Sequence, residues 1–401
     1  MKVLFLIDSL QGGGAERSLA EMLPGLAARG VDPIVVCLDR RADNVEDLIL
    51  GRFDLRYIEA RRAPGRVRAV RRMIREERPD LVHTTLLRSD LIGRFAAAGT
   101  GVPVLTSLVN LSYDPIRFSD PRIRPWVFRR VQAFDGWTAR RFNEHFHAIT
   151  GAVKDHNVAA LGIEPDRVTV VLRGRDGSRL GSPSPDRRNE ARRRLGLSDD
   201  DDVLVNVGRQ EFQKGQRYLL EAIERLTAAG RRPVALILGR RGVASAELDE
   251  LAKRPGLEGR VRFLGHVDDV ADVLAAADVF VFPSLFEGLG GSLIEAMALG
   301  LPIVASDLPA VREVLEDGAN AALVPPADAG ALAGAIAGLL GDRARAARFG
   351  RRSRELFEER YTLEASTEQM ASLYHRIVGS AVETPAVLEP AHPTMEGIEG
   401  S

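Results

Sequence analysis

The sequence predicts an α/β protein in which parallel sheets form two domains. Short apolar, β-branched runs alternate with amphipathic stretches along most of the 401 residues, which is the pattern of strands joined by crossover helices. The runs at 3–7 and 279–282 are apolar at every position, as expected for strands buried on both faces of a sheet. With 45% hydrophobic residues, a chain of this length can form two separate cores.

The domain boundaries are predicted where this alternation stops. A stretch rich in Gly, Ser, Pro and charged residues separates the two halves, and the end of the chain contains three prolines without periodicity. We predict a first domain at 1–175, a linker at 176–202, a second domain at 203–352, a terminal helix at 353–378 and a disordered tail at 379–401. The predicted strands are 3–7, 33–38, 55–58, 81–83, 104–107, 147–150 and 168–171 in the first domain, and 203–207, 234–238, 261–264, 279–282, 302–305 and 321–324 in the second.

Composition indicates an intracellular protein. Cys37 is the only cysteine, so no disulfide framework exists and a reducing cytoplasm is expected. No apolar run approaches the roughly 18 residues of a membrane span, and the first eight residues are too short an apolar stretch for a signal peptide. The preference for Arg over Lys suggests a GC-rich bacterial genome.

The stretch from Glu287 to Glu295 is the most informative in the chain. It follows a predicted strand and contains Gly288, Gly290 and Gly291, which permit a tight turn into a helix that Ser292 is expected to cap. A helix N-terminus after a glycine loop binds anions, because its first N–H groups lack intrahelical partners. Glu295 is expected in the first helical turn, where it would accept bonds from two vicinal hydroxyls, and Glu287 would face a second polyol. The pattern predicts a site for a phosphate flanked by sugars.

A basic pair follows another predicted strand. Arg209 comes directly after the strand at 203–207, and Lys214 follows five residues later, ahead of an amphipathic helix from residue 216 to 226. Both would lie at the carboxyl edge of the sheet, where open α/β sheets bind ligands. Arg can grip phosphate oxygens bidentately and Lys supplies a compact charge, so the pair suits a diphosphate. Lysine is otherwise scarce, since the chain has only Lys2, Lys154 and Lys253 besides Lys214.

These residues resemble the family 4 glycosyltransferases, a retaining family with the GT-B fold, in which two Rossmann-like domains face each other across a cleft. The resemblance covers residues 1 to about 374 and is strongest in the second half. The matching stretches are Gly12-Gly13-Gly14-Ala15-Glu16-Arg17, Val207-Gly208-Arg209 with Lys214-Gly215, Val261-Arg262-Phe263-Leu264-Gly265, Ala277-Asp278-Val279-Phe280-Val281-Phe282-Pro283-Ser284, Glu287-Gly288 with Glu295-Ala296-Met297, Gly300-Leu301-Pro302-Ile303-Val304-Ala305, and Glu313-Val314 with Asp317-Gly318.

The resemblance implies transfer of a sugar from a nucleotide diphosphate donor with retention of the anomeric configuration. It assigns catalytic roles to Arg209 and Lys214, on the donor diphosphate, and to Glu287, on the transferred sugar; Glu295 would bind the ribose. The terminal helix would cross back to the first domain. No metal or other cofactor is expected, because the basic pair can neutralise the leaving diphosphate. The remaining expected donor-binding residues are Gly13, Gly14, Gly265, Leu289, Gly290 and Gly291.

Two departures from the family pattern affect the first domain and the linker. Many relatives have a histidine near the donor sugar at a position that Val109 or Asn110 fills here, while His83 lies at a strand end where histidines are more often structural. Residues 173–176 read Arg-Gly-Arg-Asp, whereas relatives usually have an Asn-Gly-Val-Asp type sequence. Both departures bear on the acceptor chemistry more than on the donor site.

Charge is unevenly distributed along the chain. Net charge is −1, yet residues 61–142 contain seventeen Arg against seven acidic residues, interleaved in part with Trp126, Trp137 and several phenylalanines. Basic residues mixed with aromatics suit an anionic membrane surface; solvated helix faces are the alternative interpretation. No nucleic-acid motif accompanies the charge. We expect a glycan or lipid-linked acceptor and a cytoplasmic protein docked at the inner membrane face.

Two other functions are compatible with parts of the sequence. The strand at 3–7, the glycines after it and Asp39 superficially resemble a nicotinamide dinucleotide fingerprint, but Arg17 stands where a third small residue is needed. A catalytically silent sugar-nucleotide binder is the second alternative, which the replaced histidine keeps open.

Overall fold

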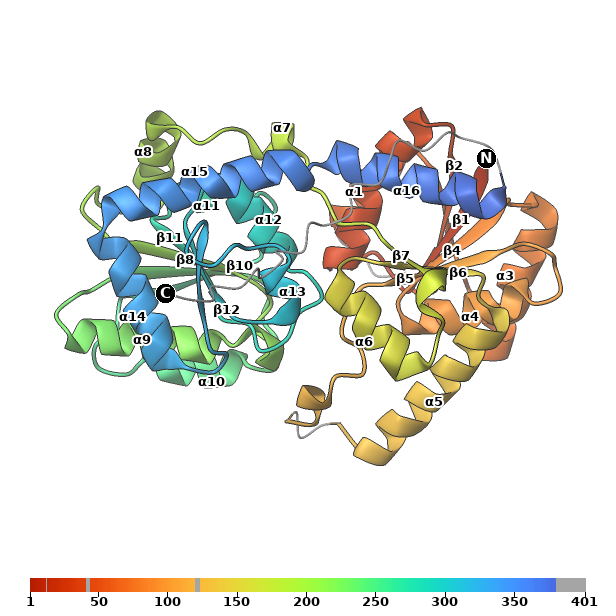
Figure 1. Ribbon diagram of the computed structural model, residues 1–401, viewed down its shortest axis with the longest axis horizontal. Helices are drawn as coiled ribbons and strands as arrows, with labels where there is room; N and C mark the ends of the chain where they lie inside the picture. Colours follow the sequence, from red (N-terminus) through yellow and green to blue (C-terminus); the bar gives the residue numbers. More distant parts are fainter. Residues whose placement is uncertain (12, 41–43, 120–122, 380–401) are drawn as a thin grey trace, which may run out of the picture.

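The computed structural model describes residues 1–11, 13–40, 44–119 and 123–379, and it shows two parallel sheets with helices on both faces (Figure 1). The seven-stranded sheet has the order β3-β2-β1-β4-β5-β6-β7, and the six-stranded sheet has the order β10-β9-β8-β11-β12-β13. All strands are parallel, but the order in which they are added to each sheet reverses between β1 and β4 and between β8 and β11. Open α/β sheets bind ligands at such switch points. The strands are β1 (Lys2–Ile7), β2 (Asp32–Cys37), β3 (Asp54–Tyr57), β4 (Leu81–Thr85), β5 (Val104–Leu108), β6 (His145–Ala148), β7 (Val168–Val170), β8 (Val203–Val207), β9 (Val234–Leu238), β10 (Val261–Gly265), β11 (Val279–Phe282), β12 (Ile303–Ser306) and β13 (Ala321–Val324).

Every predicted strand exists, and the largest displacement is at β6. The sequence predicts this strand at 147–150, but it ends at Ala148. Thr150 instead caps the next helix, because its Oγ1 accepts a hydrogen bond from the Val153 N–H at 3.1 Å. A side chain that satisfies a helix terminus thus moves the boundary by two residues.

Helices cover both faces of each sheet. In the first domain, α3, α4 and α5 pack side by side on one face, and α1 packs against α16 on the other (Figure 1). In the second domain, α9 packs against α10 and α14, while α12 packs against α15. The helices are α1 (Gly14–Ala28), α2 (Asn44–Asp47), α3 (Ala63–Glu77), α4 (Leu87–Ala97), α5 (Pro125–Phe142), α6 (Gly151–Leu161), α7 (Gly177–Leu180), α8 (Pro185–Arg194), α9 (Gln216–Ala228), α10 (Ser245–Ala252), α11 (Ala271–Ala275), α12 (Gly291–Ala298), α13 (Pro309–Arg312), α14 (Ala329–Gly341), α15 (Arg343–Arg360) and α16 (Leu363–Val378), with 3₁₀ turns η1 (Pro115–Ser119), η2 (Pro165–Arg167) and η3 (Phe212–Lys214).

Part of the predicted linker is helical. α8 lies inside the segment 176–202 and docks on the second domain, where Arg188 and Arg192 both pair with Asp278 at 2.7 Å. Arg192 is almost fully buried and also donates to backbone carbonyls. The sequence predicts a linker here from its Gly, Ser, Pro and charged residues, but two of those charged residues, Arg188 and Arg192, anchor the segment to the second domain.

The predicted helix at 353–378 is wrong as a single element, because α15 and α16 meet at a break. Around this break, the Arg175 N–H donates to the Tyr361 carbonyl and the Arg175 carbonyl accepts from the Leu363 N–H, both at 2.9 Å. Thr362 then caps α16 through its Oγ1. Backbone pairing with a distant segment therefore interrupts the helix.

The last helix belongs to the core of the first domain. Met370 and Tyr374 of α16 are buried in the same cluster as Phe5 of β1. The predicted tail at 379–401 lies, apart from Gly379, outside the described residues. None of the helices described here is long and apolar enough to cross a bilayer.

Candidate active site

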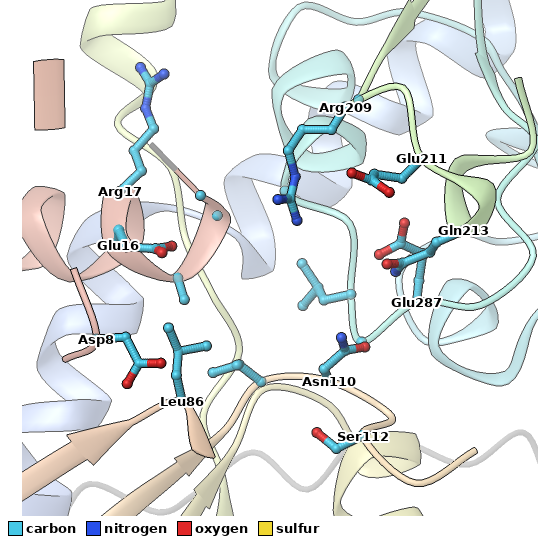
Figure 2. Close-up of a pocket in the computed structure, with 18 of the residues that line it drawn as sticks. Asp8, Glu16, Arg17, Leu86, Asn110, Ser112, Arg209, Glu211, Gln213 and Glu287 are labelled. Carbon is cyan, nitrogen blue, oxygen red and sulfur yellow. The ribbon is translucent and has the colours of Figure 1, made fainter. Parts of the chain in front are cut away.

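A cleft of about 1170 Å³ lies between the two domains, at the carboxyl edges of both sheets. Figure 2 shows side chains of both domains directed into it, with Glu16 on one wall and Arg209 and Glu287 on the other. Gly265 does not line the cleft; its carbonyl accepts from the Gly239 N–H at the end of β10. The predicted site residues that do line it are Gly13, Gly14, Arg209, Lys214, Glu287, Leu289, Gly290, Gly291 and Glu295.

The glycine loop of the second domain leads directly into α12. Gly290 has φ +86°, and a Cβ there would lie 2.7 Å from the Phe282 ring, so this position requires glycine. The prediction that Ser292 caps the helix is wrong: Gly290 is the N-cap residue, and the Ser292 hydroxyl donates to the Val207 carbonyl at 3.2 Å. No side chain therefore caps the first N–H groups of α12, which remain available to an anion.

Glu295 lies one turn further along α12 than predicted. The helix begins at Gly291, so Glu295 is its fifth residue rather than part of the first turn. Its carboxylate is buried and accepts from Nε of Arg175 at 3.0 Å, an interaction that the sequence did not predict.

Lys214 and Glu287 form an ion pair in the wall of the second domain. The Lys214 Nζ donates to Oε1 of Glu287 at 2.5 Å, and the Ser284 hydroxyl donates to the same oxygen at 3.0 Å. Lys214 ends the 3₁₀ turn η3, and Gly215 follows with φ +59° so close to the Pro283 carbonyl that no Cβ would fit. Lys214, expected to bind the diphosphate, and Glu287, expected to bind the sugar, are therefore paired with each other in the structure.

The first domain contributes its own glycine loop and Glu16. A Cβ on Gly13 would collide with the Glu16 carboxylate, so this side chain folds back over the loop at the start of α1. Burial raises the pKa of Glu16, while the charges of Arg209 and Arg173 oppose that rise. Arg209 of the second domain and Arg173 of the segment after β7 therefore both attract the Glu16 carboxylate of the first domain.

His83 is a structural residue of β4. It is buried between the Tyr374 hydroxyl at 2.7 Å and the Ser107 hydroxyl at 2.6 Å, and burial lowers its pKa to about 3. It does not line the cleft, whereas Asn110 does. Val109, the other residue expected at the histidine position, lines it as well.

Sequence reasoning missed a buried polar cluster on the first-domain side of the cleft. Arg94 pairs with Asp135 at 2.5 Å, and the Tyr113 hydroxyl donates to the same carboxylate at 2.7 Å. Asp90 lies beside them, and its Oδ1 has no hydrogen-bond partner among the described residues. The 3.6-residue periodicity of α4 could have marked Asp90 and Arg94 as inward-facing, but not Asp135, which comes from α5.

Asp90 predicts a pH-dependent effect on stability. Burial raises its pKa from 3.8 to about 8, so between these values the folded protein keeps a proton that the unfolded chain has lost. Ionisation of Asp90 therefore lowers stability progressively as pH rises through this window. Asp90→Asn should raise Tm relative to the parent protein more at pH 8.5 than at pH 5, measured by thermal unfolding. An equal Tm difference at both pH values would contradict the raised pKa.

Two family models match the chain. The model described as Glycosyltransferase Family 4 matches residues 12–179, and the model described as Glycosyl transferases group 1 matches residues 201–342. They correspond to the two domains and together include most of the residues that line the cleft.

Curated relatives agree with these models. The D-inositol 3-phosphate glycosyltransferase 2 of Catenulispora acidiphila is 32% identical over 315 residues, covering 75% of this chain and 71% of that protein. The α-D-kanosaminyltransferase of Streptomyces kanamyceticus is 34% identical over 48% of this chain and 50% of its own length. The phosphatidyl-myo-inositol mannosyltransferase of Mycolicibacterium smegmatis is 39% identical over 45% and 47%. The chain therefore spans about half the length of the latter two.

Solved structures show the same fold. The structure of Anabaena HepE in complex with UDP and glucose superposes with a TM-score of 0.82 at 23% identity, covering 93% of this chain and 99% of that one. The sucrose-phosphate synthase of Thermosynechococcus elongatus superposes with a TM-score of 0.81 at 21% identity, covering 95% of this chain and 100% of that one. With its two facing Rossmann-like domains, the chain has the GT-B fold and belongs to the family 4 glycosyltransferases.

Proposed function

We propose that this protein transfers a sugar from a nucleotide diphosphate donor to an acceptor hydroxyl, with retention of the anomeric configuration. The observation that carries the proposal is the convergence of two glycine loops, a basic pair and two glutamates on one cleft. The nicotinamide-dependent alternative would leave Arg209, Lys214 and Glu287 without a role.

The proposed reaction involves residues that line the cleft. The bond between the anomeric carbon and the diphosphate oxygen breaks, the diphosphate leaves with the electron pair, and the acceptor oxygen bonds to the anomeric carbon as its hydroxyl passes its proton to an oxygen of the leaving diphosphate. Arg209, Lys214 and the free N–H groups of α12 would stabilise the charge that develops on the diphosphate. As the family resemblance implies, Glu287 would position the sugar and Glu295 the ribose; both carboxylates are buried at the cleft, and each is paired with a cation.

The relatives support this choice of substrates. One acts, by its name, on D-inositol 3-phosphate and another on phosphatidyl-myo-inositol, while a further relative is a lipopolysaccharide core biosynthesis glycosyltransferase of Rhizobium meliloti. HepE was solved with UDP-glucose. We propose a nucleotide sugar as the donor and a lipid-linked or cell-envelope glycan as the acceptor, with no metal required.

A panel of UDP- and GDP-sugars tests the proposal. We expect the protein to release the nucleotide diphosphate from one donor, faster when membrane lipid extract supplies an acceptor. Binding of a nucleotide sugar without release, under any acceptor, would support the catalytically silent binder instead.

The structure narrows the basic surface proposed for membrane docking. Several arginines of residues 61–142 are engaged internally: Arg66 and Arg88 pair with Asp39, and Arg94 with Asp135. Helix α5 differs, because its large apolar side chains face solvent beside exposed arginines, one of which, Arg140, also donates to the Leu161 carbonyl. Those at least 37% exposed are Trp126, Val127, Val131, Phe134 and Trp137, and the exposed arginines of α5 are Arg129, Arg130, Arg140 and Arg141.

We propose that α5 rests on the anionic inner face of the membrane. Tryptophans at the headgroup level and arginines nearby are the composition of interfacial helices, and each basic residue near such a surface contributes about 1 kcal/mol. This would bring the first-domain side of the cleft toward a lipid-linked acceptor, since Val127 and Val131 also line the cleft.

Vesicle sedimentation checks the docking proposal. The protein should bind vesicles that contain anionic lipid at low salt and dissociate at high salt, because screening shortens the electrostatic range to about 8 Å at physiological ionic strength. Replacing Trp126 and Trp137 by serine should weaken binding without changing charge. Arg72→Gln on α3, whose side chain is 71% exposed, is the matched control and should bind nearly as the parent does. Absence of binding at low salt would favour a soluble acceptor.

A further inference from the structure

The short connection after β7 places two arginines between the glycine loops of the two domains. Arg173 and Arg175 both line the cleft, in the stretch where relatives usually have the uncharged residues of an Asn-Gly-Val-Asp type sequence. Neither was among the donor-binding residues predicted from the sequence. Their surroundings indicate what they bind.

Arg175 is fixed in place on all sides. Its backbone pairs with Tyr361 and Leu363, its Nε donates to Glu295 at 3.0 Å, and its Nη1 donates to the Ser18 hydroxyl at 3.3 Å. A Cβ on Gly291 would lie only 2.1 Å from Nη2, so the guanidinium stands directly against the first residue of α12. This cation is therefore held beside the helix N-terminus that is suited to phosphate.

Arg173 is half-buried and faces the cleft beside the other glycine loop. A Cβ on Gly14 would lie 3.7 Å from its Nη1. No described carboxylate forms an ion pair with it, in contrast to Arg175. Burial lowers the pKa of Arg173 to about 10 and the charge of Arg175 adds to that effect, so the side chain is still cationic at neutral pH. Arg175 is paired with Glu295 and Glu21, whereas Arg173 has no ion-pair partner among the described carboxylates, so Arg173 is the cation of the two that can bind a further anion.

Glu16 acts as an internal anion at the same place. Its carboxylate lies over Gly13, and its charge interacts with Arg209 and Arg173, one from the second domain and one from the connection. A phosphate group at this position would meet the same two guanidinium groups and would be repelled by Glu16. The Glu16 carboxylate therefore interacts with the same two cations, Arg209 and Arg173, that a bound phosphate would contact.

We propose that Arg173 binds the donor diphosphate together with Arg209 and Lys214, with Arg175 positioning Glu295 behind it, and that Glu16 competes with the diphosphate for these cations. This inference rests on the proposed function and deepens it, because it assigns the diphosphate site to three segments of the chain rather than to the second domain alone. Removing the charge of Arg173 should therefore weaken diphosphate binding, whereas removing the charge of Glu16 should strengthen it.

Calorimetry of the full chain with UDP and GDP, and with the corresponding monophosphates, tests the inference. Arg173→Asn, which restores the residue type of relatives, should weaken diphosphate binding about tenfold to a hundredfold, as expected for a charge-assisted contact, and should affect the monophosphate less. Arg173→Lys should retain part of the affinity. Glu16→Gln should bind the diphosphate severalfold more tightly. Arg88→Gln, which removes the same charge from a cleft residue paired with Asp39, is the matched control and should bind as the parent does.

The outcomes separate this inference from the proposed function. If the parent protein binds a nucleotide diphosphate and Arg173→Asn binds it equally well, the inference is overturned while the proposed function stands; Arg173 would then face an anionic acceptor, seen as a raised KM for the acceptor alone. Weaker binding by Glu16→Gln would overturn the competing role of Glu16. If the parent binds neither diphosphate, the proposed function fails and this inference with it. Thermal unfolding of Arg173→Asn and Arg173→Lys checks that both are folded.

Discussion

Replacing Lys214 by alanine should lower turnover by about thirtyfold to a thousandfold while the fold survives. One cationic contact to a leaving diphosphate contributes about 2–4 kcal/mol at the transition state, and each 1.36 kcal/mol corresponds to a factor of ten in rate. The structure adds a second cost, because the variant leaves the buried Glu287 carboxylate without its ion-pair partner. Release of the nucleotide diphosphate from the preferred donor is the measurement.

A double variant separates these two costs. Lys214→Ala combined with Glu287→Gln removes the unpaired carboxylate, so it should be more stable than Lys214→Ala; it should also be slower still, because Glu287→Gln removes the residue proposed to position the sugar. Lys253→Ala removes an exposed lysine paired with Glu250 and should turn over as the parent does. A native rate in Lys214→Ala, with any donor, would mean that this lysine does not contact the leaving group.

The two glutamates should fail in different ways when each becomes glutamine. Glu295→Gln is expected to weaken binding of the bare nucleotide diphosphate, because a charged acceptor for the ribose hydroxyls becomes a neutral one. Its effect is enlarged by the loss of the ion pair that holds Arg175 against α12. Glu287→Gln should bind the nucleotide almost normally and lose transfer, because the sugar is the part that it would position.

Calorimetry with the nucleotide, alongside turnover with the nucleotide sugar, distinguishes the two roles. Equal losses of nucleotide affinity in both variants would contradict the division of labour. The comparison is matched, since both changes remove one carboxylate charge, both residues are 6% exposed, and each side chain is paired with one cation.

Local sequence was sufficient for the elements of the sheets and for the residue types of the site. Apolar runs such as 279–282 coincide with β11, because a strand buried on both faces must be apolar at every position. Gly290 and Gly291 were identifiable because a tight turn into a helix needs residues without a Cβ. Arg209 and Lys214 follow β8 in the sequence, and they were expected in the site because the carboxyl edge of a parallel sheet binds ligands.

Local sequence misled where distant contacts decide the outcome. The break between α15 and α16 depends on backbone pairing with Arg175, nearly two hundred residues earlier. The docking of α8 on the second domain involves Asp278, which pairs with two of its arginines. In both cases the charge or periodicity is present in the local sequence, but its structural consequence depends on a residue far away in the chain.

The sequence by itself determined two parallel-sheet domains, a glycine loop leading into α12 and a set of charged residues suited to phosphate and sugar. Only the tertiary structure decided how those charges pair: Lys214 with Glu287 across 73 residues, Arg175 with Glu295 across 120, and Glu16 among cations of other segments. The physical reason is that side-chain propensities and periodicity act over a few residues, whereas the energy of a charge depends on every group that packing brings within several ångströms of it.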